Sequence, residues 1–172
     1  DRFVWGSALD GTLEENALMG KQDREPFSKR GFINHKKIRE YADHLIKSFT
    51  VKASSATQKM RELSGGNAQK LIVAREMGMD TPVLICCEPT RGIDIGAKKL
   101  VLETLVKLNR EQGMTIVMVS SELQELRSVS DRIAIVSEGK LVDILSPDAS
   151  DADFGLAMSG IKPDEHRGGE AQ

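Results

Sequence analysis

Residues that could bind phosphate begin with the stretch "LSGGNAQK", residues 63–70, where Ser64 precedes two glycines and a helical pattern. A serine hydroxyl and free backbone N–H groups at the start of a helix attract anions, because that end of the helix carries partial positive charge. The same residues also suit a plain N-cap serine on a glycine-rich turn. Taken alone, the stretch favours the N-cap interpretation over a phosphate site.

Two further polar stretches follow apolar runs. In "LICCEPTRGID", residues 84–94, Glu88 comes directly after an apolar run and Asp94 after a sharp turn, and "VSSE" places Ser121 at the end of the next run. Ligands of parallel α/β sheets bind at the carboxyl ends of the strands. If both runs are parallel strands, these polar groups and the Ser64 stretch converge on one edge of a sheet, which makes a phosphate site the better interpretation.

The elements that must hold these residues alternate in type. Charged and apolar residues recur at helical spacing over 36–49, 67–79 and 97–113, whereas 83–87 and 114–119 are short continuous apolar runs typical of buried strands. Two later runs joined at Glu138-Gly139 predict a hairpin, and Ser150 with Asp153 predicts a helix start. The fold class is α/β: a partial parallel sheet covered by helices on both faces, a C-terminal hairpin and a helical region before them.

Composition excludes several classes of function. The net charge of −2 and the pI near 6.0 give no reason to expect a nucleic-acid partner. No apolar run reaches the roughly 20 residues of a membrane span, and the first residues lack the layout of a signal peptide. Adjacent Cys86 and Cys87 are poorly spaced for a disulfide, and they make no zinc-ligand spacing with the three histidines, His35, His44 and His166. We expect a cytoplasmic protein without a metal site of its own.

The ordered motifs resemble the C-terminal part of the ATPase domain of ABC transporters, and more narrowly the ATP-binding subunits of simple-sugar and nucleoside importers. The resemblance rests on "LSGGNAQK" (signature motif), "VLICCEPTRGIDIGAK" (Walker B and D-loop), "VMVSSELQEL" (switch region) and "SDRIAIVSEGKLV", and it spans about residues 1–160. It implies a helical subdomain over 1–80 and a portion of a RecA-like lobe over 81–160, whereas the polar composition of 161–172 predicts a disordered tail. The stretch over 26–49 is slightly more similar to the nucleoside branch.

The resemblance also implies residue roles. Glu88 matches the catalytic carboxylate that activates the attacking water, Asp94 lies in the D-loop, and Ser121 stands where most ABC ATPases have the switch histidine. The residues expected to contact ATP are Ser64, Gly65, Gly66, Asn67, Gln69, Asp94 and Ser121. The signature would close on ATP bound by an opposing ATPase half, so ATP and Mg²⁺ are cofactors of the complete protein and are not expected to bind tightly to this chain alone.

Three features depart from the family pattern. No G-x-x-x-x-G-K-[ST] loop occurs, so we expect a fragment whose phosphate loop lies upstream. Cys87 replaces the Walker B aspartate, and a thiol is a poor ligand for Mg²⁺. Ser121 with Gln124 could form a capping box for the following helix instead of a catalytic contact. These features predict that the site served by this Walker B is degenerate.

Two functions remain open. The first is a fragment of the motor subunit of an ABC importer, peripheral on the inner face of the membrane, with a second ATPase half and permease subunits as partners and a solute-binding protein as an indirect one. The second is a non-catalytic ABC-like half with a regulatory or structural role. DNA-repair and chromosome-organising ABC ATPases interrupt the domain with long heptad segments, and no sustained heptad run occurs here. We also expect some self-association of the chain, because a partial sheet leaves an apolar edge or face uncovered.

Overall fold

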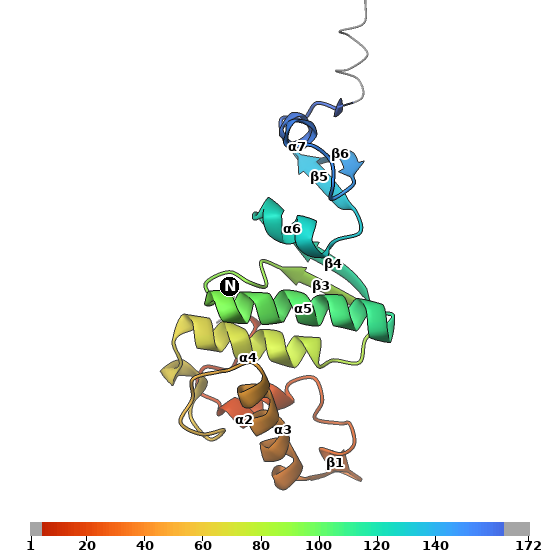
Figure 1. Ribbon diagram of the computed structural model, residues 1–172. Helices are drawn as coiled ribbons and strands as arrows, with labels where there is room; N and C mark the ends of the chain where they lie inside the picture. The colour runs from red at the N-terminus through yellow and green to blue at the C-terminus, as the bar shows by residue number, and fades with distance from the viewer. Residues whose placement is uncertain (1–4, 164–172) are drawn as a thin grey trace, which may run out of the picture. The chain divides into compact units, whose positions relative to one another are not determined.

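The computed structural model describes residues 5–163, and its chain divides into two compact units, residues 1–119 and 120–172. The first unit contains α2 (Leu13–Leu18), β1 (Ser28–Lys29), β2 (Phe32–Ile33), α3 (His35–Ser48), a 3-10 turn (Met60–Glu62), α4 (Gly65–Met77), β3 (Val83–Cys87), α5 (Ile95–Gln112) and β4 (Thr115–Val119) (Figure 1). The second contains α6 (Leu123–Val129), β5 (Ile133–Ser137), β6 (Lys140–Leu145) and α7 (Asp151–Met158). The mixture of helices and small sheets confirms the α/β class.

Helices α3, α4 and α5 form most of the core of the first unit. α4 lies beside α5, and α2 and α3 pack against each other and against α4 (Figure 1). The largest fully buried side chains of this core are Leu13, Met60, Leu71 and Val101. The amphipathic patterns predicted α3, α4 and α5, with boundaries shifted by one or two residues. α4 begins earlier than its apolar pattern because Ser64 caps it at Gly65.

β3 and β4 pair in parallel, with Val83 opposite Thr115 and Cys87 opposite Val119. α5 connects them, beginning after its N-cap Asp94 and ending at its C-cap Gly113, whose φ of 70° is the left-handed conformation common at helix ends. Leu84 and Cys86 pack against the core that α5 helps to form. This strand-helix-strand unit therefore places the ends of β3 and β4 side by side.

The expectation that helices cover both faces of this sheet is wrong for the described residues. Side chains alternate between the faces of a strand, and Val83, Ile85 and Cys87 share the face opposite to Leu84. That face is open: Ile85 is 69% exposed and Val119 52% exposed. Periodicity predicts that the runs are strands, but it cannot tell which faces are covered.

A buried polar network holds the region before α4. Lys21 Nζ donates to the Tyr41 hydroxyl at 2.7 Å and to the Gly78 carbonyl at 2.6 Å, and it lies 4.5 Å from the Tyr41 ring centre. Arg75 donates to the Gly6 and Asn16 carbonyls at 2.9 and 3.3 Å. These bonds compensate for the desolvation of two cations and fix the N-terminal residues against α4.

The second unit is built around the predicted hairpin. β5 and β6 are antiparallel, and both turn residues, Glu138 and Gly139, have positive φ, as in a type I′ turn. Its core contains Ile133, Ile135, Phe154 and Ala157. Ser150 caps α7 by accepting from the Asp153 N–H at 3.1 Å, which confirms the predicted start. Most of the predicted disordered tail, 161–172, lies outside the described residues.

Candidate functional site

Ser64 stands exposed at the N-terminus of α4. Its Oγ accepts from the Asn67 backbone N–H at 3.4 Å and from the Asn67 side-chain amide at 3.0 Å. Because the oxygen accepts both bonds, the hydroxyl hydrogen can be donated outward. Asn67 is itself held by the Lys52 N–H, which donates to its Oδ1 at 3.0 Å. The cap therefore presents a fixed hydroxyl and the first-turn N–H groups at Gly65 and Gly66.

The loop after β3 lies against this tip. An added Cβ at Gly66 would lie 2.8 Å from the Gly92 carbonyl oxygen, so only glycine fits there without displacement. Gln69 is buried, and its Nε2 donates to the Pro89 carbonyl at 3.3 Å. The structure therefore brings Gly66 and Gln69 of α4 next to residues 89–92, immediately after Glu88. The side chain of Gln69 links the two elements inside the unit and does not extend to the exposed tip.

Glu88 lies at the carboxyl end of the parallel pair, as predicted. Its N–H donates to the Val119 carbonyl at 2.8 Å, which extends the ladder by one residue, and its carbonyl accepts from the Arg91 N–H at 3.2 Å. Its φ is 49°, in the left-handed region that L-residues seldom occupy. This conformation ends β3 and turns the chain toward Asp94.

Asp94 joins the loop to both helices. Its Oδ1 accepts from the Ala97 N–H at 2.9 Å and so caps α5, and its Oδ2 lies 2.5 Å from Lys70 Nζ on α4. Hydrogen bonding from the Lys70 side chain, followed by that from the Ala97 backbone, lowers the pKa of Asp94 below its usual range. Asp94 is thus held as a carboxylate at neutral pH.

The two cysteines differ in environment. Cys87 is exposed on the open face of the sheet, whereas Cys86 is partly buried against the core, as predicted from their opposite directions along the strand. Burial raises the pKa of the Cys86 thiol to about 11. Among the described residues, no three His, Cys, Asp or Glu side chains lie close enough to hold a metal ion.

Ser121 belongs to the second unit, where Glu122 is the N-cap of α6 and makes no side-chain capping bond. The predicted cap at Ser121 is wrong: the preceding residue, Ser120, accepts from the Glu122 N–H at 3.0 Å instead. The helix starts at Leu123, one residue later than the S-x-x-Q pattern with Ser121 as N-cap implies. Ser121 is exposed within the second unit.

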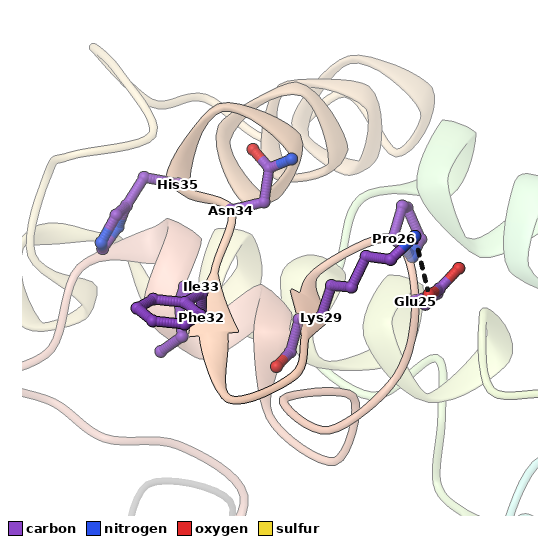
Figure 2. A pocket seen from close by; sticks show the side chains of 8 residues that line it. Glu25, Pro26, Lys29, Phe32, Ile33, Asn34 and His35 are labelled. Atoms are coloured by element: carbon purple, nitrogen blue, oxygen red, sulfur yellow. Dashed lines mark ion pairs between the residues drawn. The ribbon is translucent and has the colours of Figure 1, made fainter.

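Sequence reasoning missed two parts of the first unit. Lys70 links α4 to Asp94. The sequence indication of this contact was that Lys70 follows Gly66 by four residues and so lies on the same face of the helix. The stretch predicted as a loop contains the short hairpin β1 and β2, where Phe32 is 82% exposed. Figure 2 shows a hollow beside it, with the Lys29–Glu25 ion pair at 3.7 Å, lined by Glu25, Pro26, Ser28, Lys29, Phe32, Ile33, Asn34 and His35. None of the candidate phosphate-binding residues lines this hollow.

Comparison with known proteins supports the motif assignment. No protein-family profile matches the chain. It is 44% identical over 136 residues to the ribose import ATP-binding protein RbsA of Bacillus subtilis, covering 79% of this chain and 27% of that protein. It is 36% identical over 161 residues to the nucleoside import ATP-binding protein NupA of Lactococcus lactis, covering 93% and 32%. The guanosine import ATP-binding protein NupO of Bacillus subtilis is 34% identical, covering 93% and 31%.

Solved structures agree on the fold. The dimeric ATP-binding cassette MJ0796 in a post-hydrolysis state bound to ADP and Pi has a TM-score of 0.68 and 25% identity, covering 83% of this chain and 60% of that one. An inward-facing putative metal-chelate type ABC transporter has a TM-score of 0.64 and 16% identity, which shows the fold alone. The chain spans about a third of the curated relatives it matches. Over that third, the chain belongs to the family of ABC ATP-binding proteins that includes the ribose and nucleoside import subunits.

Proposed function

We propose that this chain is part of the motor subunit of an ABC importer for nucleosides or simple sugars, and that its Ser64 tip completes an ATP site on a partner ATPase half. The observation that carries the proposal is the exposed N-cap Ser64 of α4, whose hydroxyl oxygen accepts two hydrogen bonds from Asn67. The start of this helix packs against the loop after Glu88. Helix N-termini with free N–H groups suit phosphate oxygens. The relatives are ATP-binding proteins by name.

The two ATP sites of such a pair would differ in how fast they hydrolyse ATP. Ser64 would serve the site whose phosphate loop lies on the partner half, whereas Cys87 and Ser121 would belong to the site built on this half. Because a thiol is a poor Mg²⁺ ligand, the second site would bind nucleotide and contribute little hydrolysis. Glu88 would keep its role as a water-activating base only where a metal-bound nucleotide reaches it.

The test is ATP hydrolysis by the complete ATP-binding protein that contains this chain. Ser64→Phe should lower the rate at least about 100-fold, since it fills the position of a phosphate-binding donor. Ser48→Phe, at an exposed position at the end of α3, is the matched control and should leave the rate unchanged. Cys87→Ala should also have little effect. Equal losses from Ser64→Phe and Cys87→Ala would contradict the proposed inequality of the two sites.

The membrane subunits would contact the helical region through the β1 and β2 hairpin. Phe32 and Ile33 are 82% and 51% exposed there, which leaves an apolar surface of the kind that protein partners cover (Figure 2). Phe32→Ser should weaken co-purification with the permease subunits. Val136→Ser, at a strand position of the other hairpin that is 65% exposed, should not.

A second function is favoured by one observation, the exposed Cys87 thiol where the family has an aspartate. In that case the chain is a non-catalytic half that regulates or supports a partner. The Ser64→Phe variant of the complete protein distinguishes the two, since a purely structural half should leave the rate of MgATP hydrolysis unchanged by this substitution. The solute is a separate question, answered by uptake of labelled ribose and guanosine in cells carrying the complete importer. We expect guanosine to be taken up faster.

A further inference from the structure

Lys70 is a buried cation beneath the exposed tip of α4. Its side chain is 5% exposed, and its Nζ lies 2.5 Å from Asp94 Oδ2 and donates to the Thr50 carbonyl at 3.3 Å. A buried charge destabilises the fold strongly unless it is paired and hydrogen-bonded. Lys70 has both kinds of partner, so its ammonium group is confined to one position.

The same face of α4 contacts the loop after β3 at two other points. Gly66 and Lys70 are four residues apart and therefore lie on one side of the helix, with Gln69 beside them. Gly66 packs against the Gly92 carbonyl, and Gln69 donates to the Pro89 carbonyl. The Lys70–Asp94 pair is the third point and the only one of the three that carries charge.

Asp94 cannot move independently of this pair. One carboxylate oxygen caps α5 through the Ala97 N–H, while the other meets Lys70. A rotation that releases Lys70 would also weaken the cap, and losing an N-cap bond destabilises the start of a helix. The start of α5 and the tip of α4 are thus fixed to each other through one carboxylate.

We propose that Lys70 is a positioning residue that joins the Ser64 tip to the Asp94 loop, so that both meet a partner half as one rigid surface. The inference rests on the proposed function, because the surface acts at the partner's ATP site. Lys70 itself is buried, whereas Ser64 and Asp94 are exposed, so Lys70 acts through these two residues and does not touch nucleotide.

The experiment measures kcat and KM for MgATP hydrolysis by the complete ATP-binding protein, below the unfolding temperature of every variant. Lys70→Met should lower kcat about tenfold, because small misplacements of a site surface slow the reaction steeply, and should leave KM within about twofold. Asp94→Asn should give the same pattern, and the double variant should be no slower than either single one. Lys99→Met, which removes an exposed i,i+4 pair with Glu103 on α5, is the control and should leave kcat unchanged.

The outcomes separate the possible roles. A merely structural lysine would lower the unfolding midpoint while kcat of the folded protein stays normal, and that result would overturn the proposal. So would a raised KM at unchanged kcat, or additive losses in the double variant. Should Lys70→Met fail to fold, Asp94→Asn decides alone, since the Asp94 side chain is 63% exposed and its replacement leaves the core intact. If Ser64→Phe abolishes hydrolysis and Lys70→Met does not slow it, only this inference fails; if Ser64→Phe has no effect, the proposed function fails.

Discussion

Gly66 on α4 faces the carbonyl oxygen of Gly92 so closely that a Cβ at position 66 would stand 2.8 Å from that oxygen. Packing against the loop therefore requires glycine at position 66, independently of any contact with phosphate. The backbone of Gly92, with φ of 75°, belongs to the turn that leads from Glu88 to Asp94. The close contact fixes the helix tip relative to that turn.

Gly66→Ala should destabilise the protein by roughly 1–3 kcal/mol, because the added methyl group meets backbone and cannot be accommodated by a side-chain rotation. Chemical denaturation of wild type and variant measures the difference. Gly155→Ala is the control: position 155 lies within α7 with open space around it, so alanine there should stabilise by about 0.5–1 kcal/mol through its helix propensity. A neutral Gly66→Ala would show that α4 can shift away from the loop.

The stability of the first unit should depend on pH through Asp94. Hydrogen bonding from Lys70 lowers its pKa in the folded state, so the group contributes stability above the unfolded-state pKa of about 4. That contribution is lost as the pH falls through the lower folded-state pKa. Asp94→Asn should therefore be less stable than wild type at pH 7, and the difference should shrink below about pH 4. Urea titrations at pH 7, 4 and 3 measure it.

A matched substitution on α5 controls for the general effect of removing a carboxylate. Glu103→Gln, on the exposed side of the helix, should decline in stability with acid in parallel with wild type. If Asp94→Asn and wild type also decline in parallel, the Lys70 contact does not affect the proton affinity of Asp94.

Alkylation should distinguish the adjacent cysteines. Cys87 is exposed, whereas Cys86 is partly buried with a pKa raised to about 11. At pH 8 only roughly a thousandth of Cys86 is thiolate, the reactive form. Brief iodoacetamide treatment followed by peptide mass spectrometry should label Cys87 first, and Cys87→Ser should slow total labelling far more than Cys86→Ser. Equal rates at both positions would mean that β3 opens readily.

The open face of β3 and β4 should promote association between copies of the chain. Val83, Ile85, Val117 and Val119 make an apolar surface, and each is about half exposed or more. Light scattering of the 172-residue chain should show mass above the monomer, and Ile85→Glu should lower it. Val136→Glu, at a similarly exposed position in β5, serves as control and should leave the mass unchanged. A monomer at every concentration would refute the expectation.

The sequence predicted those elements whose periodicity is strong and whose ends carry distinct signals. α5 is an example, because Asp94 caps its start and Gly113 ends it in the left-handed conformation. α2 was not predicted, although Thr12 and Glu15 form a capping box there, because six residues are too few for a periodic pattern. The motif order predicted that Ser64 and Glu88 converge on one edge of the sheet, and the structure places Gly66, two residues after Ser64, against the Gly92 carbonyl in the loop after Glu88.

Contacts between residues far apart in the chain could not be predicted from the sequence. In the sequence, Lys70 cannot be distinguished from a solvated lysine on a helix. Only the fold shows that its side chain is buried and contacts Asp94 and the Thr50 carbonyl. The cap at Ser121 was predicted from a local pattern, but the N-cap is Glu122, whose N–H donates to the Ser120 hydroxyl. For Lys70 a second element decides the outcome, and local preference does not contain that information.

The φ of Glu88, 49°, affects the stability of the chain. An L-residue in this region costs about 1–2 kcal/mol relative to glycine, so Glu88→Gly should make the chain more stable while removing the carboxylate. Folding therefore favours glycine at position 88, whereas the proposed role in activating water would require the carboxylate. A library randomised at position 88 and selected for solubility alone should become enriched in glycine.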